Sequence, residues 1–327
     1  MIVQTGMRTD IPAFYAPWFL RRLAEGFVLV RNPYNHHAVT RFALDPAVVD
    51  MLVFCTKHPG PLLERAQAQE AGQAPHMPAL APFNQYWFVT ITPYGRDLEP
   101  NVPPWQDVAA QCRQLADAVG PERLAWRYDP IVLTPQYDAA FHMDAFAAMA
   151  RALHGLTRVC VISFIDLYAK VRRNFPAARA VELAAQEQLA QHFVRVGQQY
   201  GLTIRACAEG EHLARFGVDC AGCMTLAVYE QDLGRRLALP KGLSRARKEC
   251  ACVMGNDIGA YNSCPHLCRY CYANANAALV RANAARHDPA SPFLIGGFEE
   301  GDEVRDARQA SWLENTGTNS PEQLRLI

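Results

Sequence analysis

The sequence predicts an α/β fold: a TIM-type (β/α) barrel, complete or incomplete, with a cysteine-rich cluster-binding segment near the C-terminus. Two observations favour it. Seven short apolar, β-branched runs alternate with helical patterns between Ile2 and Cys207, and eight of the eleven cysteines lie between Cys207 and Cys271. Strands that alternate with helices indicate parallel βα units. That many units suit a barrel better than the alternative, an open doubly wound sheet.

The predicted strands share a short run of apolar and β-branched side chains, the pattern of buried parallel strands. They are Ile2–Gly6, Phe27–Arg31, Met51–Thr56, Tyr86–Thr92, Leu124–Tyr128, Val159–Ile165 and Leu202–Cys207.

Three amphipathic helices are predicted between these strands. The first opens near Pro12 and stops at Gly26, because proline suits a first helical turn and glycine a helix end. The others cover 108–119 and 189–200, where apolar residues recur at i, i+4, i+7 and i+11, and each ends at a glycine.

Half of the 327 residues are hydrophobic, enough for one large domain or two ordinary ones. We expect a barrel core over 1–210, a cysteine-rich segment packed on it over 211–295, and a polar C-terminal tail over 296–327.

The charge balance argues against bulk nucleic-acid or membrane binding, because Lys plus Arg and Asp plus Glu both number 32. We find no signal peptide and no run of about 18 apolar residues, and therefore expect a cytoplasmic protein. Closely spaced cysteines in a reducing compartment indicate metal or redox chemistry rather than disulfides.

Charged side chains recur just beyond the predicted strand ends, which in a barrel all face one mouth. The candidate catalytic residues are Arg8, Asp10, Lys57, Arg127, Asp129 and Glu209. The arginines would hold anionic groups and a carboxylate or Lys57 would move protons. The alternative is that these are solvated loops with structural ion pairs.

Cys264, Cys268 and Cys271 form a C-x3-C-x2-C pattern, so that three thiolates can converge from one loop. Structural zinc would need a fourth ligand, for which His266, Cys250 and Cys252 are candidates. A [4Fe-4S] cluster would place the thiolates on three irons and leave the fourth open or capped by a distant cysteine.

The stretch CPHLCRYCYAN resembles the cluster loop of radical S-adenosylmethionine (SAM) enzymes, the spore photoproduct lyase-like ones in particular. The resemblance implies a [4Fe-4S] cluster on the three cysteines, S-adenosylmethionine on the open iron, Tyr270 against its adenine, and an electron donor such as ferredoxin or flavodoxin. It departs from the common pattern because the loop comes late in the chain. If the last strand neighbours the first, Asp257–Tyr261 should lie beside Ile2–Asp10.

The segments RTDIPAFY, VLVRNP, RYDPI, DIGAYNSC and YCYAN also resemble a bacterial family of unassigned function. That likeness supports the fold and the cluster but supplies no substrate.

Five further cysteines could form a second site, namely Cys207, Cys220, Cys223, Cys250 and Cys252. The readings are a second metal (zinc or an iron–sulfur cluster), redox or substrate-handling thiols, and plain packing.

The function predicted from these features is radical chemistry on a small polar or anionic substrate by a cluster enzyme that binds S-adenosylmethionine. The alternatives are an iron–sulfur or zinc enzyme that acts without radicals, as a Lewis acid or in sulfur handling, and a metal-stabilised binding protein.

Overall fold

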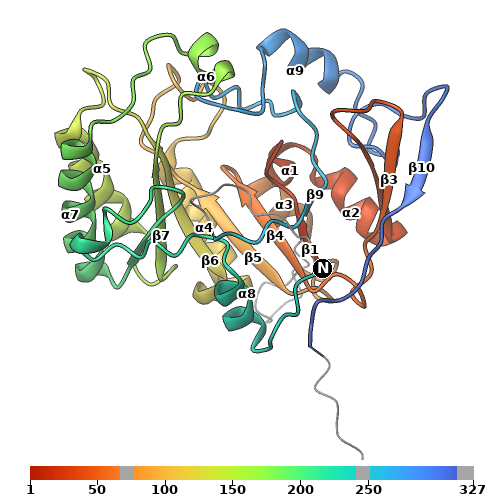
Figure 1. Ribbon diagram of the computed structural model, residues 1–327, viewed down its shortest axis with the longest axis horizontal. Helices are drawn as coiled ribbons and strands as arrows, with labels where there is room; N and C mark the ends of the chain where they lie inside the picture. The colour runs from red at the N-terminus through yellow and green to blue at the C-terminus, as the bar shows by residue number, and fades with distance from the viewer. Residues whose placement is uncertain (67–76, 241–250, 315–327) are drawn as a thin grey trace, which may run out of the picture.

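The computed structural model describes residues 1–66, 77–240 and 251–314. At its centre lies a seven-stranded parallel sheet flanked by helices, with the strand order β8-β7-β6-β5-β4-β1-β9 (Figure 1). The predicted α/β class is therefore confirmed. The strands are β1 (Ile2–Gln4), β4 (Met51–Thr56), β5 (Gln85–Thr90), β6 (Leu124–Ile131), β7 (Val159–Phe164), β8 (Thr203–Ala206) and β9 (Asn256–Asp257).

From β5 to β8 each strand pairs in parallel with the strand before it, and helices lie in the connections. Sequential pairing arises because each helical crossover returns the chain to the neighbouring position in the sheet. The helices are α1 (Ile11–Phe14), α2 (Ala16–Glu25), α3 (Gly60–Ala66), α4 (Trp105–Val119), α5 (Ala139–Ala152), α6 (Ala169–Asn174), α7 (Leu183–Tyr200), α8 (Leu226–Leu233) and α9 (Ala277–Ala284).

The predicted strand Phe27–Arg31 exists as β2, but it belongs to a second, three-stranded sheet. There β2 pairs antiparallel with β3 (Ala38–Ala43), and β3 pairs in parallel with β10 (Glu303–Asp306). Only the segment 32–37 joins β2 to β3, too short for a crossover to a parallel neighbour. Part of the predicted C-terminal tail is thus a strand of this small sheet.

The seven strands do not close into a barrel, which corrects the closed form of the prediction. β8 and β9 are the two ends of the strand order. The segment 219–225 spans the interval between them through two isolated bridges, a parallel one from Arg205 to Asp219 and an antiparallel one from Thr225 to Cys252. A backbone hydrogen bond of 2.8 Å from Val253 N to Met224 O adds to the second.

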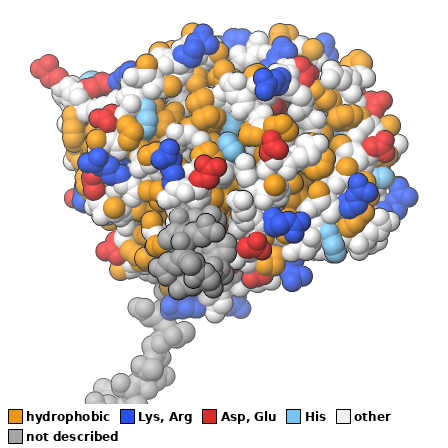
Figure 2. Space-filling view, turned by 180° about the vertical axis from the view of Figure 1, so that it is seen from behind, with side chains coloured by type: hydrophobic (Ala, Val, Ile, Leu, Met, Phe, Trp, Pro, Cys, Tyr) orange, Lys and Arg blue, Asp and Glu red, His pale blue; other side chains and the backbone are white. Residues whose placement is uncertain are grey.

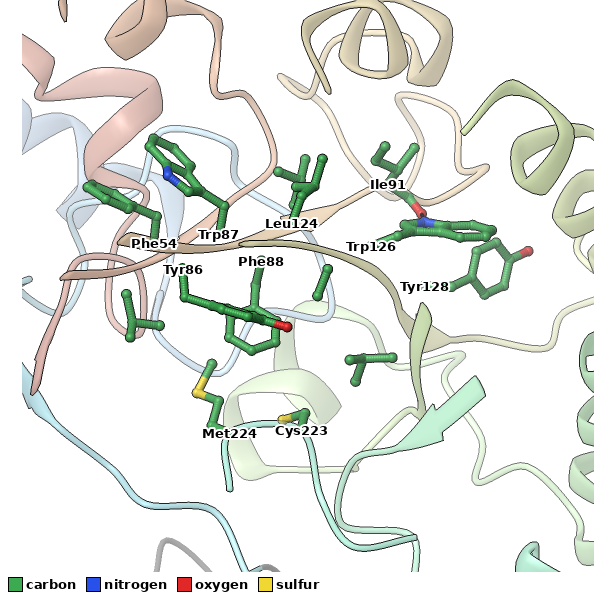
Figure 3. Close-up of a cluster of buried hydrophobic side chains, with 14 of the residues drawn as sticks. Phe54, Tyr86, Trp87, Phe88, Ile91, Leu124, Trp126, Tyr128, Cys223 and Met224 are labelled. Carbon is green, nitrogen blue, oxygen red and sulfur yellow. Dashed lines mark hydrogen bonds between the residues drawn. The ribbon is translucent and has the colours of Figure 1, made fainter. Parts of the chain in front are cut away.

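The main buried cluster runs through both predicted regions, 1–210 and 211–295, and the proposed division between them remains a prediction. Trp87 and Trp126 project from one face of the sheet, and Phe88 projects from the other, beside Cys223 and Met224 (Figure 3). The segment 219–225 therefore packs on the face opposite the two tryptophans. This is the face that carries the candidate site.

Two of the predicted helix ends are confirmed in detail. Gly26 and Gly201 adopt left-handed backbone angles (φ of 75° and 70°), which glycine adopts without steric cost. They terminate α2 and α7.

Basic and acidic side chains are interspersed over the face shown in Figure 2, consistent with the zero net charge. In the part of the chain that the structure covers, no helix is both long and apolar enough to cross a bilayer.

Candidate functional site

A cavity of about 670 Å³ lies at the carboxyl ends of the parallel strands. Its lining includes Cys207, Ala208, Cys223 and Met224, and further residues between Cys252 and Asn274. The structure brings most of the sequence-predicted site residues to its wall: Arg8, Asp10, Lys57, Arg127, Asp129, Cys207, Cys223, Cys252, Cys264, Cys268, Tyr270 and Cys271.

Two predicted residues stand apart from this wall, and a third lies outside the described part of the chain. Glu209 does not line the cavity, and its Oε1 accepts a hydrogen bond of 2.9 Å from the Phe164 backbone N–H. Cys220 does not line it either, and its thiol donates to Val218 O at 3.6 Å. Cys250 lies outside the described residues.

Strand alternation explains which side chains reach the cavity. Thr90 and Arg127 are paired in the ladder between β5 and β6, so their side chains share one face of the sheet. Asp129 lies two residues further along β6 and Ser163 near the end of β7, and both line the same cavity. Because side chains alternate between the two faces of a strand, Arg127 and Asp129 of the stretch RYDP both reach the cavity.

The cysteine loop is fixed to the N-terminal part of the chain. The Tyr15 hydroxyl donates to Ser263 O, and the Tyr272 hydroxyl donates to Met7 O. Inside the loop, the Asn274 amide donates to Cys264 O at 2.8 Å. These bonds orient the three thiols before any ligand is bound.

The three thiols of the loop are buried side chains that need a cation to become thiolates. Burial raises the pKa of Cys264, Cys268 and Cys271, and the nearby carboxylates of Asp10 at Cys264 and Glu99 at Cys268 add to the effect. Lys57 and Lys170 oppose it at Cys271, and the Ala273 backbone N–H donates to Cys271 Sγ at 3.3 Å. Such N–H···S contacts are typical of sulfurs that bind iron or zinc.

Asp10 connects the first strand, the β4 end and the cysteine loop. Its Oδ1 accepts the Ala13 N–H at 3.1 Å and caps α1, while its Oδ2 accepts the Lys57 backbone N–H at 2.7 Å. The same Oδ2 lies 2.9 Å from His266 Nε2. These contacts make Asp10 a positioning residue for α1, the β4 end and the cysteine loop, and its catalytic role remains a prediction.

His266 is not placed as the fourth metal ligand that the sequence allowed. Its Nε2 contacts Asp10, and its Nδ1 lies 3.2 Å from Asn101 O. Both ring nitrogens are therefore engaged with protein oxygens, and the imidazole holds the loop in place.

We expect Asp10→Ala to lower the free energy of unfolding by about 1–3 kcal/mol, since it leaves the buried donors of Ala13, Lys57 and His266 without their acceptor. Chemical denaturation would measure the loss. Asp10→Asn keeps one acceptor oxygen and should recover part of it. Equal stability of Asp10→Ala and the unchanged protein would contradict this role.

Lys57, Glu99 and Tyr270 form a buried polar cluster that the sequence analysis did not foresee. The Lys57 ammonium lies 2.8 Å from Glu99 Oε1, and the Tyr270 hydroxyl donates to the same oxygen. Burial alone would lower the Lys57 pKa, but the Glu99 carboxylate outweighs it and raises that pKa. Glu99 lies in a loop after β5, and no motif in the sequence distinguishes it.

Arg127 and Asp129 form an ion pair inside the cavity, and Ser163 Oγ donates to the other carboxylate oxygen of Asp129. Burial disfavours the charged carboxylate, but the Arg127 guanidinium outweighs this effect and lowers the Asp129 pKa. The positive charge of Arg127 is thus balanced by the Asp129 carboxylate.

Arg8 is likewise paired, and its partner lies on β9, the strand next to β1. Its guanidinium donates to the Asp257 carboxylate and, at 2.8 Å, to Asp257 O. Gln4 of β1 is paired in parallel with Asp257 of β9. The expectation that Asp257–Tyr261 lies near Ile2–Asp10 is therefore confirmed for Asp257.

Three of the five further cysteines converge on the same cavity. Cys223 Sγ lies 3.4 Å from Cys207 Sγ and 3.7 Å from Cys252 Sγ. Hydrogen bonding from Cys223 and the charge of Arg127 together lower the pKa of Cys207. Over the described ranges, no group of three or more His, Cys, Asp and Glu side chains is already arranged as a metal site.

Comparisons with solved structures give only remote likenesses. A variant of Rhizobium etli pyruvate carboxylase, crystallised without acetyl coenzyme A, is 11% identical over 70% of this chain, with a TM-score of 0.29. The carboxyl transferase domain of the same enzyme with pyruvate gives 11% over 67%, with a TM-score of 0.24. The match covers 24% and 38% of those two chains, respectively.

No curated protein matches the sequence. A family model described as "Domain of unknown function (DUF1848)" matches residues 2–273, which include the whole parallel sheet and the cysteine loop. The chain is a member of the DUF1848 family.

Proposed function

We propose that the protein is an enzyme that holds a [4Fe-4S] cluster on Cys264, Cys268 and Cys271 and binds S-adenosylmethionine beside it. We further interpret the parallel sheet as an unfinished (β/α) barrel. The observation that carries the proposal is that the three motif thiols line one cavity with charged strand-end residues. Active sites of such folds lie at the carboxyl ends of the strands.

The donor set fits such a cluster, because all three ligands are thiols, the softest ligands that proteins offer to iron. They come from one loop, and the charges of Lys57 and Lys170 favour the thiolate form of Cys271. When bound, a cluster of this kind with S-adenosylmethionine supplies a 5′-deoxyadenosyl radical. An external electron donor such as ferredoxin or flavodoxin would provide the electron.

Tyr270 would support the cofactor from the cavity wall. Its hydroxyl is held by Glu99, and the Lys57 ammonium lies 5.6 Å from its ring centroid. These contacts fix the ring plane, so that an adenine could lie against it without the cost of ordering a mobile side chain.

Lys170 is the residue that favours an anionic or polar substrate. It donates to Ala273 O at 3.3 Å and faces the Tyr261 ring at 4.7 Å from the centroid. Within the described ranges it has no carboxylate at salt-bridge distance, in contrast to Arg8, Lys57 and Arg127. Its charge remains for a small molecule in the cavity, and the paired residues would shape the cavity around that molecule.

The test is cleavage of S-adenosylmethionine by the anaerobically reconstituted protein with a strong reductant. We expect 5′-deoxyadenosine and methionine in equal amounts, and loss of both products in Cys271→Ala. Binding of S-adenosylmethionine to iron-loaded protein without cleavage would overturn the radical reaction and favour a non-radical cluster enzyme. A protein that takes up no iron would overturn the proposal as a whole.

A further inference from the structure

The second group of thiols lies where three separate segments meet. Cys207 directly follows β8, Cys223 belongs to the segment 219–225, and Cys252 lies shortly before β9. Cys223 and Cys252 are 2% and 4% exposed, and all three residues line the cavity. Figure 3 shows Cys223 on the inner side of the sheet, below Phe88.

The backbone around these thiols is fixed in unusual geometry. Ala208 has a φ of 61°, uncommon for a residue with a side chain, and Gly222 has a φ of 107°. A Cβ on Gly222 would lie 3.4 Å from Cys252 Sγ. The Met224 N–H donates to that sulfur at 3.2 Å. The constrained backbone of these segments thus brings the sulfurs of Cys207, Cys223 and Cys252 together.

We propose that Cys207, Cys223 and Cys252 bind one thiophilic metal ion, Zn²⁺, with a fourth position that faces the cavity and that no described side chain fills. Zinc–sulfur bonds of about 2.3 Å in a tetrahedron separate two sulfurs by about 3.8 Å. The contacts of 3.4 Å and 3.7 Å through Cys223 are close to that edge. Cysteines on different irons of a cluster are held further apart by the cube between them, so a single ion fits better.

The side chains need a small adjustment to enclose the ion, since as they stand no described group surrounds a metal. The adjustment would follow from deprotonation of the three thiols. The sulfurs that now share hydrogen bonds would then turn their lone pairs to the cation. Arg127, although paired with Asp129, also interacts electrostatically with Cys207 and Cys223, and the two charges of the zinc ion would offset most of the charge of three thiolates. The site is independent of the cluster proposed for the C-x3-C-x2-C loop.

The open position sets the chemistry of the ligand. Zinc with three protein ligands and a free fourth position is the pattern of catalytic rather than structural sites. A substrate thiolate, carboxylate or water could occupy it inside the same cavity as Lys170. The ion would act as a Lewis acid or lower the pKa of the bound group.

The experiment measures zinc and iron separately in the full chain, purified without oxygen. We expect about one zinc ion per chain, lost in Cys207→Ser, Cys223→Ser and Cys252→Ser. Iron should remain in these variants, whereas Cys264→Ala should lose iron and keep zinc. Cys112→Ser, at a buried position of α4 outside the cavity lining, is the matched control and should keep both metals.

Cobalt provides a readout that does not depend on activity. Zinc-depleted protein titrated with Co²⁺ should develop the intense visible bands of a tetrahedral thiolate site, and the same titration of Cys223→Ser should not. Circular dichroism confirms that each variant is folded. Absence of zinc and of cobalt bands in the folded, unchanged protein would overturn the proposal. So would a Cys207–Cys223 disulfide in the anaerobically purified chain.

Discussion

Replacing Cys268 with alanine is expected to abolish iron binding and, with it, all turnover of S-adenosylmethionine. Cys268 is 8% exposed and lies between the other two thiols of the loop in sequence. Without it, only two thiolates of the loop remain to bind the cluster, and one iron loses its protein ligand. Anaerobic reconstitution followed by iron and sulfide analysis measures the effect. We expect the content to fall from about four irons per chain to near zero.

Cys160→Ala provides the matched control, because it removes an equally buried thiol in β7 that lies outside the cavity wall. It should keep its iron while losing some stability to the cavity it creates. If Cys268→Ala retained the full iron content, the assignment of the cluster to this loop would be wrong.

Arg127→Met is expected to lower the free energy of unfolding by about 3–5 kcal/mol, since it leaves the Asp129 charge buried without its partner. The two side chains are 15% and 17% exposed in the folded protein. Urea denaturation at neutral pH measures the loss. The double variant Arg127→Met, Asp129→Asn should be more stable than Arg127→Met alone, because no unpaired charge remains.

The pH dependence gives a second measurement of the same pair. Asp129 has a lowered pKa in the folded state, so its contribution is present above the ordinary carboxyl pKa and is lost as pH falls through the folded value. The unchanged protein should therefore lose stability over that acidic range more steeply than the double variant. Identical acid profiles for the two proteins would show that the pair contributes no net stability.

Periodicity and helix-stop signals were sufficient to predict most of the central sheet. Six of the seven predicted strands are strands of that sheet, because buried parallel strands are continuous apolar runs. β9 escaped prediction because it is only two residues long and polar, Asn256–Asp257, and its strand character comes from pairing with β1. Between β8 and β9 the described residues form isolated bridges rather than a further strand ladder.

The sequence predicted most of the residues that line the candidate site, but not the contacts between them. Strand-end position alone brought Arg8, Lys57, Arg127 and the cysteine loop to one cavity. Sequence position could not show that Asp10 and His266 contact each other across 256 residues. Nor could it separate Cys220 from Cys223, three residues apart, since only the turn at Gly222 decides which thiol faces the cavity.

The pairing of β1 with β9 has a consequence for how the chain matures in the cell. During synthesis, β1 emerges first and one edge of it stays unpaired until Asn256–Asp257 leaves the ribosome. At about 5–20 residues per second the interval lasts roughly 12–50 s. An exposed strand edge is a template for wrong association over that time. The thiols that would bind metal emerge at the end of this interval, so a chain whose translation stops early carries an incomplete set of ligands. Under the proposed function, metal loading would be a late step that a prematurely terminated chain does not reach.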